Sequence, residues 1–419
     1  MNGIALRDEV HAKLEHIGSA DIVIGIPSFN NARTIGHVIL AVQAGLAKYF
    51  PACRAVLVNS DGGSTDGTLD VVQQTSMADF DAILLQHRVE PIARLAFHYT
   101  GIPGKGSAFR SIFEVASALD AKACAVVDSD LRSITPEWVE LLIKPVLEHG
   151  FDFVAPLYHR HKFDGTITNS IVYPLTRALY GKRVRQPIGG DFGFSGAMAR
   201  FYLEQDVWDS DVARFGIDIW MSTTAIANGF KVAQSFLGAK IHDAKDPGAD
   251  LSDMLYQVVG STFGLMERYA PIWRPIRGSE AVTTFGFEYT VGLEHVSVNT
   301  ARMLKLFREG LANLREIWVD VLGQGDFGEV EKLGSQSDGE FRFPMGLWVH
   351  VVYGFAIAFH RNKLPAAHLI KALTPLYIGK TAAFVLQAEQ LTQREAENEI
   401  EQLCAAFENA KDYLVNNWI

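Results

Sequence analysis

The stretch that decides the fold is Ala123-Cys124-Ala125-Val126-Val127-Asp128-Ser129-Asp130. Five consecutive apolar residues predict a buried strand, and two carboxylates follow at its carboxyl end. Open α/β sheets bind their ligands at that edge. Carboxylate oxygens suit a hard divalent cation, which often holds substrate phosphates as well. We therefore expect Asp128 and Asp130 to bind a metal ion, with capping of the following turn as their alternative role.

Strands alternate with helices along the first half of the chain. The expected strands are 21–27, 54–58, 82–85 and 123–127, and the expected helices are 34–50 and 106–119. Such alternation is typical of a mostly parallel, doubly wound sheet. Further strands are expected at 151–157, 193–196 and 232–237. The predicted fold class is therefore α/β.

The pattern becomes helical beyond roughly residue 250. Apolar residues recur there at three- and four-residue steps, and Thr392 with Glu395 forms a capping box that opens a last helix. Residues 323–340 are rich in Gly, Ser and acid, which predicts an exposed connection. We expect an α/β domain at 1–250 and a helical region at 251–419 that covers a cleft or supports a homodimer.

Composition excludes several classes of protein. The chain has 419 residues, is 48% hydrophobic and carries a net charge of −10, which disfavours a nucleic-acid partner. No apolar stretch is long and charge-free enough to span a bilayer, and the N-terminus lacks the pattern of a signal peptide, so we expect a soluble cytoplasmic protein. The three cysteines have no metal-binding spacing and are expected to be small buried apolar residues.

Two turns that open helices carry candidate nucleotide-binding residues. The turn Asp61-Gly62-Gly63-Ser64-Thr65-Asp66-Gly67-Thr68 follows a strand, and Asp61 can accept hydrogen bonds from a base or a hydroxyl. Its other interpretation is a strand–helix turn with an N-cap. In Pro103-Gly104-Lys105-Gly106 the backbone can approach a phosphate and Lys105 adds a positive charge. A solvated turn lysine is the alternative.

A candidate anion-binding segment is Tyr-His-Arg-His-Lys at residues 158–162, and a candidate metal ligand is the downstream His242. Arg160 suits bidentate capture of a carboxylate or phosphate, and Thr168 could donate to the same anion. A solvated charged loop is the alternative. His242 is a plausible third metal ligand and would favour manganese over magnesium, unless it is simply a surface histidine.

Two further segments have a pattern that suggests a substrate site. Gln186-Pro187-Ile188-Gly189-Gly190-Asp191-Phe192-Gly193 has three glycines within five residues, which indicates a backbone that passes close to a substrate. Asp218 stands among apolar neighbours at the start of a helix, so it is either an N-cap or a functional carboxylate.

Taken in order, these motifs resemble the sugar-nucleotide-dependent glycosyltransferases of the GT-A fold, and more specifically the retaining enzymes that make mannosylglycerate, glucosylglycerate and glucosyl-3-phosphoglycerate. The resemblance covers about residues 21–250. The matching motifs are Ile24-Gly25-Ile26-Pro27-Ser28-Phe29-Asn30, Gly63-Ser64-Thr65-Asp66-Gly67-Thr68, Pro103-Gly104-Lys105-Gly106, Asp128-Ser129-Asp130, Gln186-Pro187-Ile188-Gly189-Gly190, Gly216-Ile217-Asp218 and His242.

The resemblance implies a role for each matching residue. Pro27, Asn30 and Asp61 would face the nucleoside, Lys105 would contact the nucleotide, and Asp128 would reach the ribose or the metal. Asp130 and His242 would hold Mg²⁺ or Mn²⁺ on the diphosphate. Arg160 and Thr168 would hold the acceptor carboxylate, Gly189 and Gly190 would line the sugar and acceptor site, and Asp218 would bond the donor sugar or the acceptor hydroxyl.

The resemblance also implies the reaction. A hexose, mannose or glucose, would pass with retention from a GDP- or UDP-sugar to glycerate or 3-phosphoglycerate, with Asp218, Lys105 and Arg160 acting on the reacting groups. One alternative is a nucleotidyltransferase, which would need a glycine- and lysine-rich loop after the first strand. Residues 27–31 do not provide such a loop. The other is a non-catalytic sugar-nucleotide binder, which should tolerate loss of Asp130 or His242.

Overall fold

The computed structural model describes residues 8–75, 92–99, 102–214, 216–241, 252–289, 292 and 296–418. The chain divides into two compact units. The sheet unit consists of Met1–His159, Gln186–Asp243 and Val282–Val291, and the helical unit consists of Arg160–Arg185, Ala244–Ala281 and Gly292–Ile419. Residues 160–185, which precede the boundary expected at residue 250, therefore belong to the helical unit, and residues 282–291, which follow it, belong to the sheet unit. The predicted strand at 82–85 lies outside the described residues.

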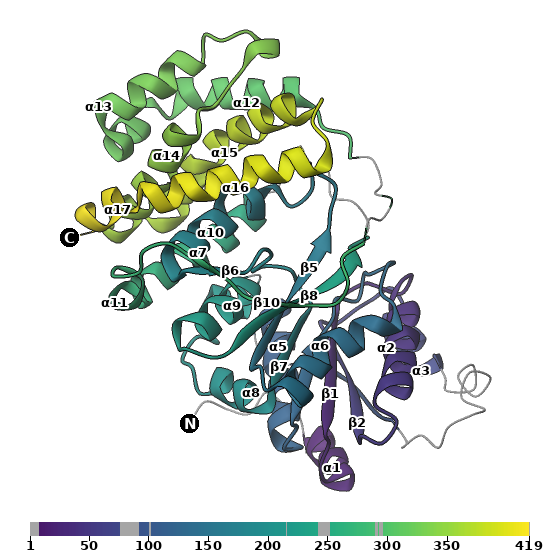
Figure 1. Cartoon of the computed structure of the whole chain (residues 1–419). Helices are drawn as coiled ribbons and strands as arrows, with labels where there is room; N and C mark the ends of the chain where they lie inside the picture. Colours follow the sequence, from purple (N-terminus) through teal and green to yellow (C-terminus); the bar gives the residue numbers. More distant parts are fainter. Residues whose placement is uncertain are drawn as a thin grey trace. The chain divides into compact units, whose positions relative to one another are not determined.

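The sheet unit is built on an 8-stranded sheet in the order β10-β8-β5-β7-β4-β1-β2-β3 (Figure 1). Its strands are β1 Ile22–Ser28, β2 Ala55–Asp61, β3 Ala93–His98, β4 Ala123–Val126, β5 Phe153–His159, β7 Phe192–Ser195, β8 Val232–Ala239 and β10 Thr283–Phe285. Only β7 runs antiparallel to its neighbours among these strands. The predicted mostly parallel α/β sheet is confirmed.

The strands of the sheet unit are interspersed with helices along the chain. They are α1 Asp8–Ile17, α2 Ile35–Tyr49, α3 Thr68–Gln74, α5 Lys105–Ala118, α6 Pro136–His149, α8 Gly196–Leu203 and α9 Ile217–Ala227. The central strands β1 and β4 are buried along their whole length, as expected of parallel strands covered on both faces. A Cβ at Gly25 in β1 would lie 2.5 Å from Ile112, so the missing side chain lets α5 pack against the sheet.

The helical unit consists mainly of α-helices. Its elements are the π-helical turn η1 Thr168–Val172, α7 Tyr173–Tyr180, β6 Lys182–Arg183, α10 Ser252–Arg268, α11 Ala270–Trp273, β9 Glu280–Ala281, α12 Thr300–Asn313, α13 Arg315–Leu333, α14 Met345–His360, α15 Ala366–Ala388, α16 Gln393–Asn409 and α17 Lys411–Asn417. The capping box at the start of α16 is present. The connection predicted at 323–340 is wrong in its first half, because α13 continues to Leu333 through a non-helical Gly323.

Buried charge explains why residues 160–185 join the helical unit. The Arg177 side chain is 6% exposed and pairs with Glu401 at 2.5 Å and with Glu408 at 2.7 Å, both on α16. Arg185 pairs with Glu397 of the same helix at 2.5 Å. A buried arginine needs such partners, since an unpaired buried charge costs several kcal/mol. These pairs hold α7 and the segment after it against α16.

One described helix, α15, has the length and composition to cross a membrane. In the fold, 67% of its most apolar window is buried, which is typical of the core helix of a folded unit. Cys124 and Cys404 are buried and Cys53 is half-buried, and all three are free thiols. The cytoplasmic location stays a prediction.

Candidate active site

The predicted site residues of the sheet unit gather at one edge of the sheet. Strands β1, β2, β4, β5 and β8 are parallel, so their carboxyl ends meet there. Asp61 ends β2, Asp128 follows β4 and Lys240 follows β8. Lys105 begins α5, and Asp218 lies in the first turn of α9. The structure therefore brings these predicted residues together at one edge of the sheet.

Lys105 joins two of the predicted carboxylates. Its Nζ lies 2.8 Å from Asp128 Oδ1 and 3.2 Å from Asp218 Oδ1, and all three side chains are at most 20% exposed. Burial alone would lower the pKa of Lys105, but Asp128 and Asp218 outweigh it and raise the pKa, so the ammonium stays charged. This geometry excludes the alternative interpretation of Lys105 as a solvated turn lysine.

The backbone around Lys105 does not form an open phosphate cradle. A Cβ at Gly104 or Gly106 would lie 2.6 Å and 1.9 Å from backbone oxygens of residues 212–213. The amide of Gly104 donates to the Tyr99 hydroxyl, and that of Gly106 donates to the carbonyl of Arg214. These glycines therefore serve close backbone packing, and it is the Lys105 side chain that is available to a ligand.

Lys240 is a second lysine that contacts Asp128. Lys105, Asp128 and Lys240 together form what we call the Lys105 cluster. Its side chain is 5% exposed, and its Nζ donates to Asp128 Oδ2 at 2.7 Å, to Asp191 Oδ2 at 2.7 Å and to the Gly189 carbonyl at 2.8 Å. Sequence reasoning missed both Lys240 and Asp191. Their signal was weak: Lys240 ends an apolar strand two residues before His242, and Asp191 ends the glycine-rich turn.

Asp191 holds the loop after β4. It is fully buried, its Oδ1 accepts the Asp128 amide at 2.7 Å, and its Oδ2 accepts the Tyr158 hydroxyl besides Lys240. Burial raises the pKa of Asp191, and the neighbouring Asp128 raises it further. Burial also raises the pKa of Asp218. In contrast, the two lysines outweigh burial at Asp128 and lower its pKa, so Asp128 is the carboxylate held in the charged form.

The residues predicted to hold a metal ion differ in their surroundings. Asp130 is half-buried, and within the described residues its carboxylate has no protein partner. Both Asp128 oxygens are bonded to lysines, so Asp128 would have to exchange one of these contacts to ligate a cation. His242 lies outside the described residues. Two carboxylates in one loop are hard oxygen donors that fit Mg²⁺ or Mn²⁺, and Asp130 is the more accessible of them.

Asp61 is placed differently from its prediction. It is fully buried, its Oδ1 accepts the amides of Gly63 and Ser64, and its Oδ2 accepts the hydroxyls of Ser28 and Ser64 at 2.8 and 2.7 Å. Burial raises the pKa of Asp61, but these hydrogen bonds outweigh it and lower the pKa. With both oxygens engaged, the carboxylate shapes the turn and does not face a nucleoside directly.

The loop after β1 is the part of this edge that is open to solvent. Pro27 is buried within β1, whereas Phe29 is 61% exposed and Asn30 is exposed with φ of 55°. The Asn30 amide donates to Ser64 Oγ at 2.8 Å, and its side-chain oxygen accepts the Thr65 amide at 2.9 Å. The two predicted nucleoside loops are thus bonded to each other, and Phe29 adds an exposed ring that sequence reasoning missed.

Gly189 and Gly190 pack against the cluster. A Cβ at Gly189 would lie 2.1 Å from Pro156, and one at Gly190 would lie 2.3 Å from Asp128 Oδ2 and 3.1 Å from Lys240 Nζ. Gly190 also has φ of 90°, which L side chains rarely adopt. The absent side chains at this turn leave space for the Asp128 carboxylate and its lysines.

Gly190→Ala is expected to lower kcat/KM about a hundredfold, because the methyl group displaces Asp128 and a misplacement of about 1 Å at a reacting site costs that much. Gly229→Ala is the matched control: Gly229 has φ of 75° and nothing within 4 Å of the point where a Cβ would lie, so it carries the backbone strain without the clash. Steady-state kinetics and thermal unfolding of both variants check this. Equal losses of activity would mean that backbone strain alone is responsible.

Arg160 and Thr168 belong to the helical unit. Arg160 Nη1 lies 3.5 Å from Asp164, and Thr168 is buried at the start of the π-helical turn η1. Single π-turns occur often at functional sites. The role of both residues in holding an acceptor stays a prediction.

Comparison with known proteins finds a matching family and two similar enzymes. Residues 23–208 match the family described as Glycosyl transferase family 2. Glucosyl-3-phosphoglycerate synthase of Petrotoga mobilis is 24% identical over 275 residues, which cover 62% of this chain and 78% of that protein. The enzyme of the same name from Persephonella marina is 30% identical over 139 residues, which cover 29% and 34%.

A solved structure was also matched. Glucosyl-3-phosphoglycerate synthase from Mycobacterium tuberculosis, in complex with Mn²⁺, uridine diphosphate and glucosyl-3-phosphoglycerate, is 20% identical with a TM-score of 0.43, over 62% of this chain and 84% of that one. The match to the family and the curated relatives confirm the predicted resemblance and the prediction that the chain is a glycosyltransferase.

Proposed function

We propose that the chain is a metal-dependent retaining glycosyltransferase that moves glucose from a uridine-diphosphate sugar to a small hydroxy acid such as glycerate or 3-phosphoglycerate. The observation that carries the proposal is the Lys105–Asp128–Lys240 cluster at the ligand-binding edge of the sheet. The names of the curated relatives favour glucose over mannose and phosphoglycerate as an acceptor.

Lys105 would bind the diphosphate of the donor. Its ammonium is fixed between Asp128 and Asp218, so little reorganisation is needed when a phosphate oxygen approaches. Charge develops on the leaving diphosphate as the bond from the sugar carbon to the phosphate oxygen breaks, and a preorganised cation stabilises that charge. Lys240 keeps Asp128 charged and holds it in contact with Lys105.

Asp130 and His242 would hold the divalent cation, which when bound neutralises charge on the diphosphate. Asp130 is the described residue whose carboxylate is accessible for this role. Asn30 and Phe29, on the exposed loop after β1, would contact the nucleoside. Asp61 stabilises that loop by accepting hydrogen bonds from the hydroxyls of Ser28 and Ser64.

Asp218 would hydrogen-bond a sugar or acceptor hydroxyl. It is held 3.2 Å from Lys105, and burial raises its pKa. We propose that the acceptor oxygen bonds to the sugar carbon on the face that the diphosphate leaves, while the acceptor proton passes to a leaving phosphate oxygen. Arg160 and Thr168 would hold the acceptor carboxylate, and a homodimer and the use of GDP-sugars stay predictions.

A matrix of donors and acceptors tests the proposal. UDP-glucose, GDP-glucose and GDP-mannose are each incubated with glycerate or 3-phosphoglycerate, with Mn²⁺, with Mg²⁺ or with chelator, and products are followed by proton NMR. We expect UDP-glucose and a divalent cation to give a product with the donor's anomeric configuration. An inverted anomer would refute retention, and absence of transfer from every donor would refute the proposed reaction.

A further inference from the structure

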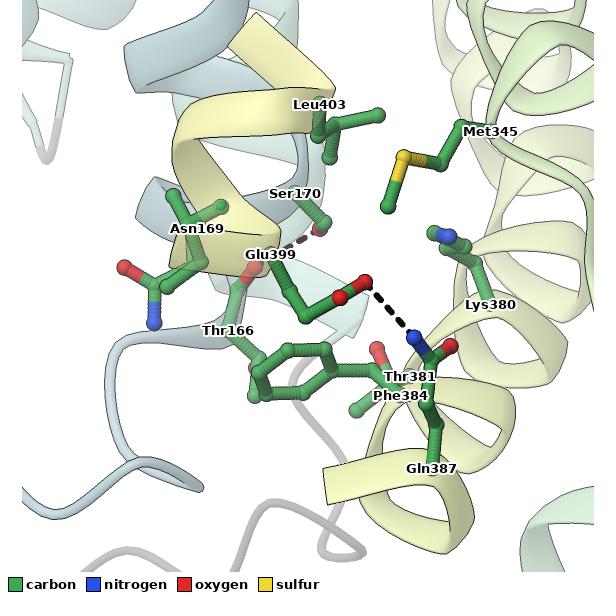
Figure 2. A pocket seen from close by; sticks show the side chains of 11 residues that line it. Thr166, Asn169, Ser170, Met345, Lys380, Thr381, Phe384, Gln387, Glu399 and Leu403 are labelled. Atoms are coloured by element: carbon green, nitrogen blue, oxygen red, sulfur yellow. Dashed lines mark hydrogen bonds between the residues drawn. The ribbon is translucent and has the colours of Figure 1, made fainter. Parts of the chain in front are cut away.

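The helical unit contains a pocket that the proposed reaction does not use. Figure 2 shows the side chains that surround it. Its walls come from the segment around η1, from the start of α14, and from α15 and α16. They are formed by Thr166, Asn169, Ser170, Met345, Lys380, Thr381, Phe384, Gln387, Glu399, Ile400 and Leu403.

Lys380 is the buried cation of this pocket. The residue is 7% exposed, and its Nζ donates to the carbonyl of Phe343 at a long 3.3 Å. Within the described residues, no acceptor takes its two other N–H groups. Burial lowers the pKa of Lys380 to about 8. The negative charge of Glu399 acts to raise this pKa but does not compensate for burial. A buried ammonium with so few acceptors is costly unless an anion completes its shell.

The other walls define which anion fits. The hydroxyl of Ser170 already donates to the Thr166 carbonyl and that of Thr381 to the Tyr377 carbonyl, so Lys380 is the main donor. Met345, Phe384, Ile400 and Leu403 provide an apolar lining. One cation and apolar walls suit a single carboxylate with a short carbon chain better than a phosphate dianion.

Glu399 supplies an acceptor at the half-exposed side of the pocket. One of its oxygens accepts from Gln387 Nε2 at 2.6 Å, which leaves lone pairs on the carboxylate for a donor on a ligand (Figure 2). Lys380 on α15 and Glu399 on α16 therefore present a cation and an anion to the same small space.

We propose that this pocket binds a small monocarboxylate that carries a hydrogen-bond donor, either a hydroxyl or an ammonium group, a few carbons away. The ligand carboxylate binds the Lys380 ammonium, its carbon chain packs on Met345 and Leu403, and its donor group reaches Glu399. The site is distinct from the Lys105 cluster and does not depend on the reaction proposed there, since none of its lining residues is one to which that reaction assigns a role.

The methionine lining the pocket provides a local readout. The chain has 8 methionines, so carbon-13 labelling of their methyl groups gives few NMR signals, and Met345→Leu assigns the signal of Met345. The full-length protein is titrated with butyrate, 3-hydroxybutyrate, 4-aminobutyrate and inorganic phosphate. We expect a saturable shift of the Met345 signal with 3-hydroxybutyrate or 4-aminobutyrate, and which of the two binds more tightly identifies the donor group.

Three variants locate the binding. Lys380→Met should weaken the binding at least about tenfold, because a hydrogen bond to a charged group is lost. Lys371→Met should leave affinity within about twofold, since this lysine is exposed on the same helix and makes no contact with the pocket. Glu399→Gln, on the half-exposed side, should weaken 4-aminobutyrate most and butyrate least.

Other results would overturn the proposal. They are the absence of any Met345 shift, equal affinities of the wild type and Lys380→Met, or a response to phosphate alone. If Lys380→Met failed to fold, as judged by circular dichroism, Glu399→Gln would decide. Unchanged affinity of that variant for the two donor-bearing probes would refute the role of Glu399 and with it the proposed ligand class.

Discussion

Lys105→Met is expected to lower kcat/KM for the sugar nucleotide about a thousandfold, which is the upper range for removing one charge-stabilising donor from an active site. The Nζ of Lys105 lies within 3.2 Å of two carboxylates, so the ammonium is fixed before the donor binds. Without it, the charge that develops on the leaving diphosphate would lose the cation that we propose binds it. The loss should fall on kcat as well as on nucleotide affinity.

Lys122→Met is the matched control for this variant. Lys122 also pairs with an aspartate, Asp21 at 2.8 Å, but its side chain is 70% exposed. Such a surface pair contributes little, so the control should keep full activity. Thermal unfolding of both variants separates a loss of folding from a loss of chemistry. Activity of Lys105→Met within a few-fold of wild type would contradict the assignment of Lys105.

Asp130→Ala is expected to abolish metal-dependent turnover, a loss of at least about a thousandfold, because the cation supplies several kcal/mol of charge stabilisation. Asp130 is the accessible carboxylate of the loop after β4, and the neighbouring Asp128 is bonded to Lys105 and Lys240. Binding of Mn²⁺, measured by electron paramagnetic resonance, should be lost together with activity.

Asp209→Ala provides the control for the metal experiment. Asp209 is exposed and lies in a turn of the sheet unit, so the change removes one carboxylate without touching the cluster. It should bind Mn²⁺ as the wild type does. Undiminished turnover of Asp130→Ala in the presence of chelator would show that the proposed metal site is wrong.

The core of the sheet could be predicted from the sequence because its strands are continuous apolar runs. Residues 123–127 and 22–27 are buried on both faces, and no other element type explains runs of that length. The carboxylates that follow β4 were located for the same reason. The division into units could not be predicted, since Arg177 finds its partners Glu401 and Glu408 more than two hundred residues away.

The candidate site was predicted in part. Lys105 and Asp128 are brought together as expected, but Lys240 and Asp191 are single charged residues in ordinary surroundings, and only the packing of β8 and the glycine-rich turn places them at Asp128. Asp61 was predicted to accept hydrogen bonds from a base or a hydroxyl of a ligand. Its neighbours Ser28 and Ser64 instead donate to its oxygens within the fold. A sequence lists the polar groups, but it does not show which of them bond to each other.

We expect the edge of the sheet beyond β4 to bind a cation and the diphosphate of an activated sugar. Crystals grown with UDP and Mn²⁺, with anomalous diffraction measured at the manganese edge, would reveal both ligands. We predict an anomalous peak within coordination distance of Asp130, with a phosphate oxygen bonded to the Lys105 ammonium. A nucleotide and metal bound elsewhere, with the Lys105–Asp128–Lys240 contacts unchanged and Asp130 without a ligand, would show that this edge is not the donor site.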